Sequence, residues 1–499
     1  MMSWLIILPV IFPLCGTFFL YLFRRDNRIV TAVSWVTSGF GVIVSILLMH
    51  RVYILGPQAI SLGSWPAPFG VVFAADLLSA AMVAVTWLIG LGVVVYAAAD
   101  LNANPSYPRF HLLIHFLLTG VNGAFLTGDL FNLYVWFEVM LIASFSLMTL
   151  DADTTQIHGS IKYVLLNLIS TLTLLLAIGL LYGATGMLNL AGLHFKTHTL
   201  SPGFVSLLSG LFLFSFSVKS ALFPVFAWLP ASYHTLPSSI AALFAGLLTK
   251  VGIYAMMRIF TLVLPFEGTI WQTILIVLSG LTMLTGVLGA AARFTIKKIL
   301  SFHIISQVGY IIIGLGLYTR LALAGSILYL IHHIIVKANL FLIGGFLNRK
   351  FGSDHLSHMG GVYRSLPLLA VLFLIPAFSL AGFPPLSGFW SKFAVVRASL
   401  ETGHTILAAT ALFVGVLTVY SMLKIWNQVF WEAAPKDITP SPSMSFRQTC
   451  LYLVPIGIFA LITIIIGLFA EPFFQYADRA AVQLLDPIFY VKALLGDRS

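Results

Sequence analysis

Apolar segments of about 20 residues, the length of helix that crosses the hydrocarbon core of a bilayer, follow one another along this chain. Apolar residues make up 60% of the 499 residues and charged residues only 8%, whereas a soluble domain carries about 25% charged residues. A water-soluble fold could not cover its surface with so few charges. The sequence therefore predicts an all-α polytopic membrane protein.

The apolar windows, divided by Gly, Pro and clusters of charge, predict about 14 membrane-spanning helices. Their approximate positions are residues 3–23, 29–49, 74–98, 110–128, 130–150, 160–184, 203–229, 238–264, 270–292, 300–319, 322–347, 366–400, 405–430 and 451–475. The first window precedes its arginines, which is the reverse of a signal peptide, so we expect it to remain as a span.

The distribution of Lys and Arg predicts how the chain is oriented. One set of alternate loops is basic and contains Arg24, Arg25, Arg28, Arg109, Arg293, Lys297, Lys298, Arg349, Lys350, Arg364, Lys436 and Arg447. The other set has fewer: Arg51, Lys196, Arg320, Arg479, Lys492 and Arg498. Cytoplasmic loops are enriched in Lys and Arg. We therefore expect the first set of loops on the cytoplasmic side of the cell membrane and both termini on the outer side. This bias explains the net charge of +10 without a nucleic-acid partner.

Two halves of the chain share a pattern. Gly159–Val164 reads GSIKYV and Gly325–Leu330 reads GSILYL, and proline interrupts two long apolar segments at Pro224 and at Pro384 and Pro385. Proline removes a helical hydrogen bond, and interrupted segments at matching places in two halves are typical of inverted-repeat transporters. We expect two inverted five-helix repeats with broken helices 7 and 12.

The predicted organisation has four parts. They are residues 1–100 with three peripheral N-terminal spans, 101–268 with the first repeat, 269–432 with the second repeat, and 433–499 with a cytoplasmic loop, the last span and an external tail.

Titratable residues in the middle of apolar segments are the candidate functional groups. A charge at the bilayer centre costs at least about 2.5–3.5 kcal/mol, so we expect one that is present to have a function. The candidates are Glu138, Lys219, Lys250, His332, His333, Lys337 and Lys392. A desolvated lysine holds its proton less tightly, a nearby carboxylate favours its charged form, and histidine titrates near neutral pH. These residues predict a path for protons.

Structural roles remain open for some charges. A buried pair such as Glu138 with Lys219 can hold helices together without moving ions, although Lys250 and Lys392 would still lack partners. Charges near segment ends can extend to the membrane surface and are assigned structural roles. These are Asp76, Lys162 and Arg258.

Cofactor chemistry is not expected. His111 and His115 have a spacing that suits a metal or haem, but no second pair at a matching depth completes a site. The sequence has no phosphate-binding loop, dinucleotide-binding motif or CxxC cluster. We therefore expect no cofactor, no metal and no enzyme activity.

Three runs resemble the antiporter-like subunits shared by respiratory complex I and Mrp-type multisubunit cation/proton antiporters. They are Val218–Pro230, Leu248–Gly252 and Ala381–Phe393. The likeness covers nearly the whole chain. The chain length, Lys392 and the run His234–Gly246 resemble the D-type subunits of Mrp antiporters.

The resemblance implies a role for each candidate. Glu138 and Lys219 would form a modulating pair, and Lys250 would be the central proton carrier. The connecting group would be His332, His333 or Lys337, and the terminal group would be Lys392. It implies a proton-translocating subunit of a bacterial Na⁺/H⁺ antiporter that works with other membrane subunits and lipid. The alternative is a proton-pumping membrane subunit of a complex I-type NADH–quinone oxidoreductase.

Overall fold

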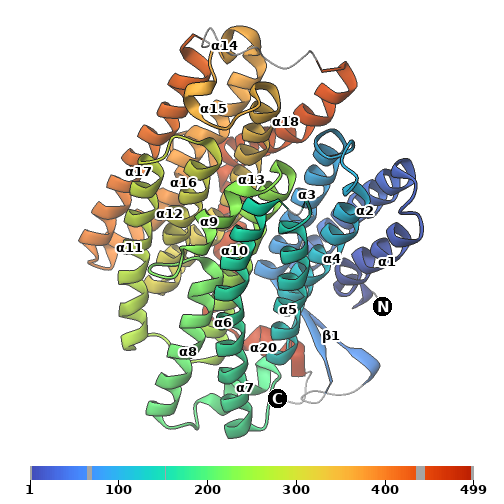
Figure 1. Ribbon diagram of the computed structural model, residues 1–499. Helices are drawn as coiled ribbons and strands as arrows, with labels where there is room; N and C mark the ends of the chain where they lie inside the picture. The colour runs from blue at the N-terminus through green and yellow to red at the C-terminus, as the bar shows by residue number, and fades with distance from the viewer. Residues whose placement is uncertain (1–2, 65–69, 152, 434–443, 496–499) are drawn as a thin grey trace.

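The computed structural model describes residues 3–64, 70–151, 153–433 and 444–495, and most of them are helical (Figure 1). Lys436 and Arg498, two of the basic residues that bear on orientation, lie outside the described residues. Twelve helices in the described part of the chain are long and apolar enough to cross a membrane, and two shorter apolar helices are Leu8–Leu22 and Pro367–Ala381. The prediction of a polytopic helical membrane protein is confirmed, and the count of 14 spans stays a prediction.

The elements follow one another in this order. The N-terminal part has the 3₁₀ helix η1 (Ser3–Ile6), α1 (Leu8–Leu22), α2 (Asn27–Leu55), β1 (Gln58–Ser61), η2 (Leu62–Ser64), β2 (Val72–Ala75) and α3 (Leu77–Asp100). The next part has α4 (Tyr107–Leu126), α5 (Leu130–Met148), α6 (Thr154–Thr185), α7 (Leu190–Thr197), α8 (Pro202–Ser220), α9 (Trp228–Ser232), η3 (Tyr233–Thr235), α10 (Ser238–Arg258) and the π-helical η4 (Ile259–Val263).

The second half has α11 (Ile270–Ala291), α12 (Ile296–Leu317), α13 (Arg320–Phe351), η5 (Leu356–His358), α14 (Val362–Ser365), α15 (Pro367–Ala381), α16 (Ser387–Glu401), α17 (Thr405–Ile425) and the π-helical η6 (Trp426–Trp431). The chain then continues through α18 (Phe446–Leu468), α19 (Ala470–Leu485) and α20 (Ile488–Leu495).

One small feature departs from the all-helical prediction. Strands β1 and β2 pair antiparallel, from Gln58 opposite Ala75 to Ser61 opposite Val72. The strands are four residues each, too short for an alternating pattern to separate them from a loop. They lie at the end of the bundle that also holds α20 (Figure 1).

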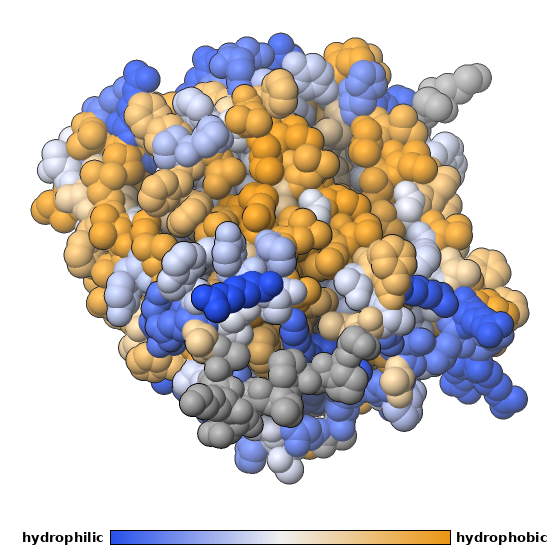
Figure 2. Space-filling model, turned by 90° about the horizontal axis from the view of Figure 1, so that it is seen from above, coloured by the Kyte–Doolittle hydropathy of each residue, from blue (hydrophilic) through white to orange (hydrophobic). Residues whose placement is uncertain are grey.

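The helices sort into a buried centre and an outer ring. Every residue of α10 is buried, and so is nearly all of α12 and α13. A helix that is apolar on all sides belongs in the interior of the bundle. Helices α2, α6, α17 and α18 instead expose apolar side chains such as Val36, Leu165 and Val416. Figure 2 shows hydrophobic side chains over much of one face, with hydrophilic ones gathered mainly near opposite edges.

Both long segments that contain the interrupting prolines are broken helices. Pro224 lies between α8 and α9, and Pro384 and Pro385 lie between α15 and α16. Each first half ends in a residue with positive φ, Ala221 at 58° and Gly382 at 94°. The two N–H groups that follow each first half bond to carbonyl oxygens of its last turn, which satisfies part of that helix end inside the bundle.

The shared GSI patterns mark equivalent packing. A Cβ atom on Gly159 of α6 would lie 3.1 Å from the Cα of Ser232 in α9, and one on Gly325 of α13 would lie 3.0 Å from the Cβ of Ala394 in α16. Each glycine therefore lets its helix approach the second half of a broken helix. In addition, α10 and α17 both continue into a π-helical turn, which is rare.

These correspondences favour two related repeats, and the division into residues 101–268 and 269–432 stays a prediction. Their inverted relation, and the separation of residues 1–100 and 433–499 as flanking parts, stay predictions.

Candidate proton path

Four lysines of the candidate path are buried among the helices. Lys250 and Lys337 are fully buried, and Lys219 and Lys392 are 6% and 9% exposed. The described residues form three ion pairs, and none of them contains any of these lysines. A buried charge with no opposite charge beside it is costly to keep, so these positions favour groups that exchange a proton.

Glu138 and Lys219 lie on neighbouring helices without forming an ion pair. The Nζ atom of Lys219 lies 4.4 Å from the centroid of the Phe137 ring, next to Glu138 in sequence. The Oε1 atom of Glu138 is buried and has no hydrogen-bond partner among the described residues. The aromatic face stabilises the ammonium. The two members of the predicted modulating pair are thus close in the fold but form no ion pair with each other.

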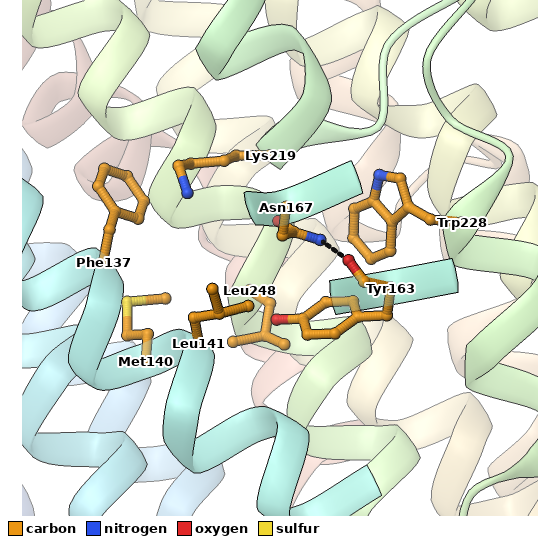
Figure 3. A pocket seen from close by; sticks show the side chains of 8 residues that line it. All are labelled: Phe137, Met140, Leu141, Tyr163, Asn167, Lys219, Trp228 and Leu248. Carbon is orange, nitrogen blue, oxygen red and sulfur yellow. Dashed lines mark hydrogen bonds between the residues drawn. The ribbon is translucent and has the colours of Figure 1, made fainter. Parts of the chain in front are cut away.

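A small cavity reaches the Lys219 side chain. Figure 3 shows its lining from α5, α6, α8, α9 and α10, namely Phe137, Met140, Leu141, Tyr163, Asn167, Lys219, Trp228 and Leu248. About 20 Å³ is open to the centre of a water molecule, which suffices for one water. A polar cavity of this size beside an ammonium gives a proton a place to leave the lysine.

A close helix contact places Lys219 against α10, the helix that carries Lys250. A Cβ atom on Gly252 of α10 would lie 3.0 Å from the Cβ of Lys219, so α8 and α10 nearly touch there. Lys219 lies in the last turn of α8, where the helix carbonyls favour a cation. Lys250 donates to the carbonyl oxygen of Ala245 in its own helix.

The next groups lie on α13, which packs against α10. His333 is fully buried, and neither of its ring nitrogens has a partner among the described residues. Lys250 and Lys337 lie near enough for their charges to act on this ring. The Nζ atom of Lys337 donates to the carbonyl oxygen of Leu300 in α12, 3.2 Å away. His333 is therefore a buried ring that both lysine charges reach.

His332, the residue before His333, lies beside the break between α15 and α16. Its Nδ1 atom lies 2.7 Å from the Oγ of Ser387 at the start of α16. That hydroxyl lies 3.0 Å from the Oγ of Ser379 in α15. Hydrogen bonds thus connect, one after another, a side chain of α13, one of α16 and one of α15.

Lys392 closes the far end of the path. Its Nζ atom donates to the carbonyl oxygens of Leu380 and Ala381, 2.9 and 3.3 Å away, at the end of α15. The same atom lies 4.4 Å from the centroid of the Tyr310 ring. The ammonium is held by the unsatisfied carbonyls that the break creates.

Three residues of α12 complete the line and were missed in the sequence. His303, Gln307 and Tyr310 are four and three residues apart, so they share one face of the helix. Both ring nitrogens of His303 and the Nε2 of Gln307 lack partners among the described residues. The Oε1 of Gln307 accepts a bond from the Tyr329 hydroxyl of α13. The signal in the sequence was this spacing inside an otherwise apolar segment.

The charges assigned to segment ends need one correction. Asp76 and Arg258 do not extend to the membrane surface but form a buried ion pair of 2.7 Å. The pair is covered because the C-terminal helices fold over it, with the guanidinium 4.5 Å from the centroid of the Tyr490 ring. Lys162 is exposed on α6. A structural role still holds for the pair.

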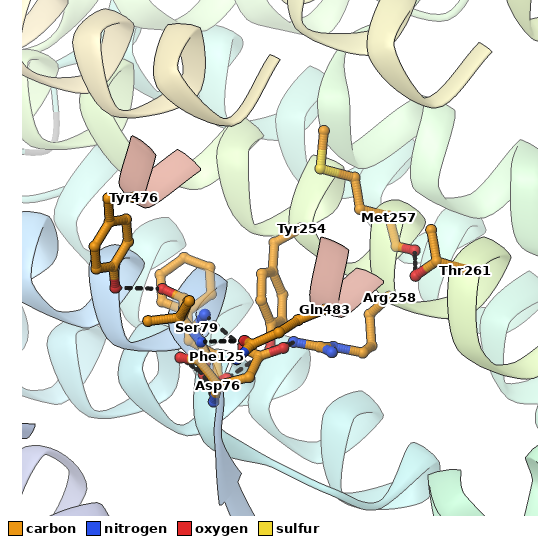
Figure 4. A network of polar contacts seen from close by, with 10 residues as sticks. Asp76, Ser79, Phe125, Tyr254, Met257, Arg258, Thr261, Tyr476 and Gln483 are labelled. Carbon is orange, nitrogen blue, oxygen red and sulfur yellow. Dashed lines mark hydrogen bonds and ion pairs between the residues drawn. The ribbon is translucent and has the colours of Figure 1, made fainter. Parts of the chain in front are cut away.

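Figure 4 shows how this pair joins four parts of the chain. Arg258 also donates to the Tyr254 hydroxyl, 3.2 Å away, which donates to the carbonyl oxygen of Phe125, 2.7 Å away. From α19, the Gln483 side chain accepts from the N–H of Leu77 next to Asp76, at 3.0 Å. The network fastens α19 and α10 to the start of α3.

The two histidines of α4 are buried as well. The Nδ1 of His111 lies 2.8 Å from the Oγ of Ser34, and the Nδ1 of His115 lies 2.9 Å from the carbonyl oxygen of His111. Across the described ranges, no group of three or more His, Cys, Asp or Glu side chains could hold a metal ion.

Comparisons with known proteins agree with this architecture. The family model described as NADH:quinone oxidoreductase/Mrp antiporter, transmembrane, matches residues 127–418. The chain is 45% identical to the D subunit of the Na(+)/H(+) antiporter of Alkalihalophilus pseudofirmus, covering 99% of this chain and 100% of that one. It is 37% identical to the protein of the same name from Bacillus subtilis, covering 99% of each.

A chain in the structure of the Mrp complex from Dietzia sp. has a TM-score of 0.92 and 31% identity, covering 99% of each chain. Both the whole-length identity and the fold agree with the resemblance in the sequence. The chain belongs to the NADH:quinone oxidoreductase/Mrp antiporter family of membrane proteins, among the relatives of Na⁺/H⁺ antiporter D subunits.

Proposed function

We propose that this chain is the D-type, proton-translocating membrane subunit of a multisubunit Na⁺/H⁺ antiporter. The observation that carries the proposal is the line of buried lysines without ion-pair partners among the described residues, in a chain 45% identical over its length to an antiporter D subunit. The protein is a transporter component and not an enzyme. It works with other membrane subunits, and H⁺ and Na⁺ are the ions exchanged.

The proposed path runs from Lys219 to Lys392 across the bundle. Protons pass from Lys219 and its cavity to Lys250, and from there to His333 and Lys337. The residues of α12 and the hydroxyls near His332 complete the path to Lys392. Glu138 modulates the first step, since its charge favours the protonated form of a nearby lysine.

The roles of the path residues rest on burial and contact. Water supplies the remaining hydrogen bonds, because buried polar groups such as the His333 ring are rarely left unpaired in proteins. A chain of such groups passes a proton by successive exchange, and no bound metal or cofactor takes part in the proposed path.

The proposed orientation places both termini outside the cell membrane. It is supported by the basic residues at one end of the bundle, including Arg28, Arg349 and Arg447. Lys392 then lies in a helix that runs outward, so the proton leaves toward the exterior. Labelling of single cysteines at Ser353 and Gln475 with an impermeant reagent tests this: Ser353 reacts only from the cytoplasm and Gln475 only from outside.

A complex I-type role is the other function known in the family, and no observation favours it, because full-length relatives at 45% and 37% identity are named antiporter subunits. The test of function is transport by the whole complex. Everted vesicles that carry the intact complex should show Na⁺-driven proton movement without NADH. Transport that requires NADH and a quinone would contradict the antiporter assignment.

A further inference from the structure

A groove with a volume of about 880 Å³ opens at the basic end of the bundle, away from the proton path. It lies where the start of α2, the end of α3, the end of α13 and the start of α18 meet (Figure 1). Its lining includes Arg28, Trp35, Asp100, Arg349 and Arg447. Four elements far apart in the sequence therefore form one concave surface.

The open charge of the groove is positive. Arg28, Arg349 and Arg447 come from three different helices, are exposed, and form no ion pair with any described residue. The Asp100 carboxylate accepts hydrogen bonds from the N–H and the hydroxyl of Ser239, at 3.3 and 3.1 Å. Three arginines from different helices thus line one space, together with one carboxylate that already accepts hydrogen bonds.

Guanidinium groups arranged in this way suit a phosphate. The planar fork of arginine binds phosphate oxygens in pairs, and basic pockets between membrane helices bind phospholipid headgroups. The groove also has an apolar wall, with the Trp35 ring held by a 3.3 Å bond from Nε1 to the carbonyl oxygen of Val94. Tryptophan is enriched at the level of lipid headgroups.

The surface below the groove fits the rest of a lipid. In the turns that follow Trp35, α2 exposes Val36 by 72% and Ile43 by 57%. A free phosphate ion would not use this apolar face, whereas acyl chains would cover it and gain from the burial.

We propose that this groove binds an anionic phospholipid, with its phosphate held by Arg28, Arg349 and Arg447 and its acyl chains lying along α2. The bound lipid joins α2 and α3 to α13 and α18 at this end of the bundle.

The test is lipid retention by the intact complex. The complex is purified, stripped of lipid with detergent, and supplied with phosphatidylglycerol in a phosphatidylcholine background, and bound lipid is counted by native mass spectrometry. The variant R28Q/R349Q/R447Q should retain phosphatidylglycerol at least about tenfold more weakly. The control R25Q/R109Q/R364Q, with the same loss of charge on exposed arginines outside the groove, should retain it unchanged.

A second variant separates loss of lipid binding from loss of the fold. R28K/R349K/R447K keeps the charge but loses the paired bonds, and intermediate retention is expected. Undiminished retention by the Gln variant would overturn the proposal. Displacement of the lipid by equimolar soluble glycerol phosphate would overturn the assignment to a lipid, as would crosslinking of residue 447 to another subunit in place of lipid.

Discussion

The Nζ atom of Lys392 donates a 2.9 Å hydrogen bond to the carbonyl oxygen of Leu380, so a side chain of α16 satisfies the last turn of α15. This contact gives one lysine two tasks. It stabilises the broken helix, and it places an exchangeable proton at the end of the line of buried groups. The two tasks make different demands on the side chain, and substitutions separate them.

Lys392→Arg should keep the fold and lose transport. Arginine keeps the positive charge and the donors for the α15 carbonyls but is not deprotonated in proteins. Lys392→Met removes the donors and leaves buried carbonyls unpaired, which costs about 1–3 kcal/mol. Na⁺-driven proton movement in vesicles and thermal unfolding of the purified complex measure the two effects. Transport by the Arg variant at the unsubstituted rate would contradict the role as a proton-releasing group.

Tyr329→Phe should slow transport with little loss of stability. The substitution removes the hydroxyl that donates to Gln307, and a net contribution of about 1 kcal/mol is expected for that bond. The ring continues to pack between α12 and α13. The matched control is Tyr182→Phe, since Tyr182 is 51% exposed on α6. Equal transport rates for the two variants would exclude this hydroxyl from the path.

Asp76→Asn should destabilise the protein by about 3–5 kcal/mol, because it leaves the Arg258 guanidinium buried without its partner. The double variant Asp76→Asn with Arg258→Met should recover much of this loss, since no charge then remains buried. Thermal unfolding in detergent measures both. Similar unfolding temperatures for the single and double variants would show that the ion pair is not what holds this network.

Gly309→Ala should destabilise the packing of α11 on α12 by about 1–3 kcal/mol. An added Cβ would lie 2.7 Å from the carbonyl oxygen of Ser279 and 2.9 Å from the N atom of Met283, and backbone atoms cannot rotate away. Gly179→Ala is the control, since nothing lies within 4 Å of its added Cβ in α6. That variant should be neutral or slightly more stable. Equal losses of thermal stability for both would contradict the close approach.

Hydropathy and the positions of proline were enough to predict most of the helices and both helix breaks from the sequence. Runs of apolar residues predict helices because a bilayer demands internally bonded backbone, and Pro224, Pro384 and Pro385 predict breaks because proline lacks an N–H. The buried lysines were equally visible, since a charge within an apolar run is rare enough to signal function.

Other features depend on which face of a helix meets which neighbour. Asp76 and Arg258 are 182 residues apart, and only the folded chain shows that α19 and α20 cover them. His303 and Gln307 are ordinary polar residues in a helix until α13 packs beside them. The separation of Glu138 from Lys219 depends on the placement of the Phe137 ring. Spacing along one chain does not encode these contacts.

Among the lysines of the proposed path, Lys250 donates a hydrogen bond within its own helix, to the carbonyl oxygen of Ala245 in α10. The central claim is tested most directly by Na⁺-driven proton movement in everted vesicles that carry Lys250→Ala, with assembly of the complex checked in parallel. The path through Lys250 predicts background transport by a fully assembled complex. Transport at the rate of the unsubstituted complex would contradict it.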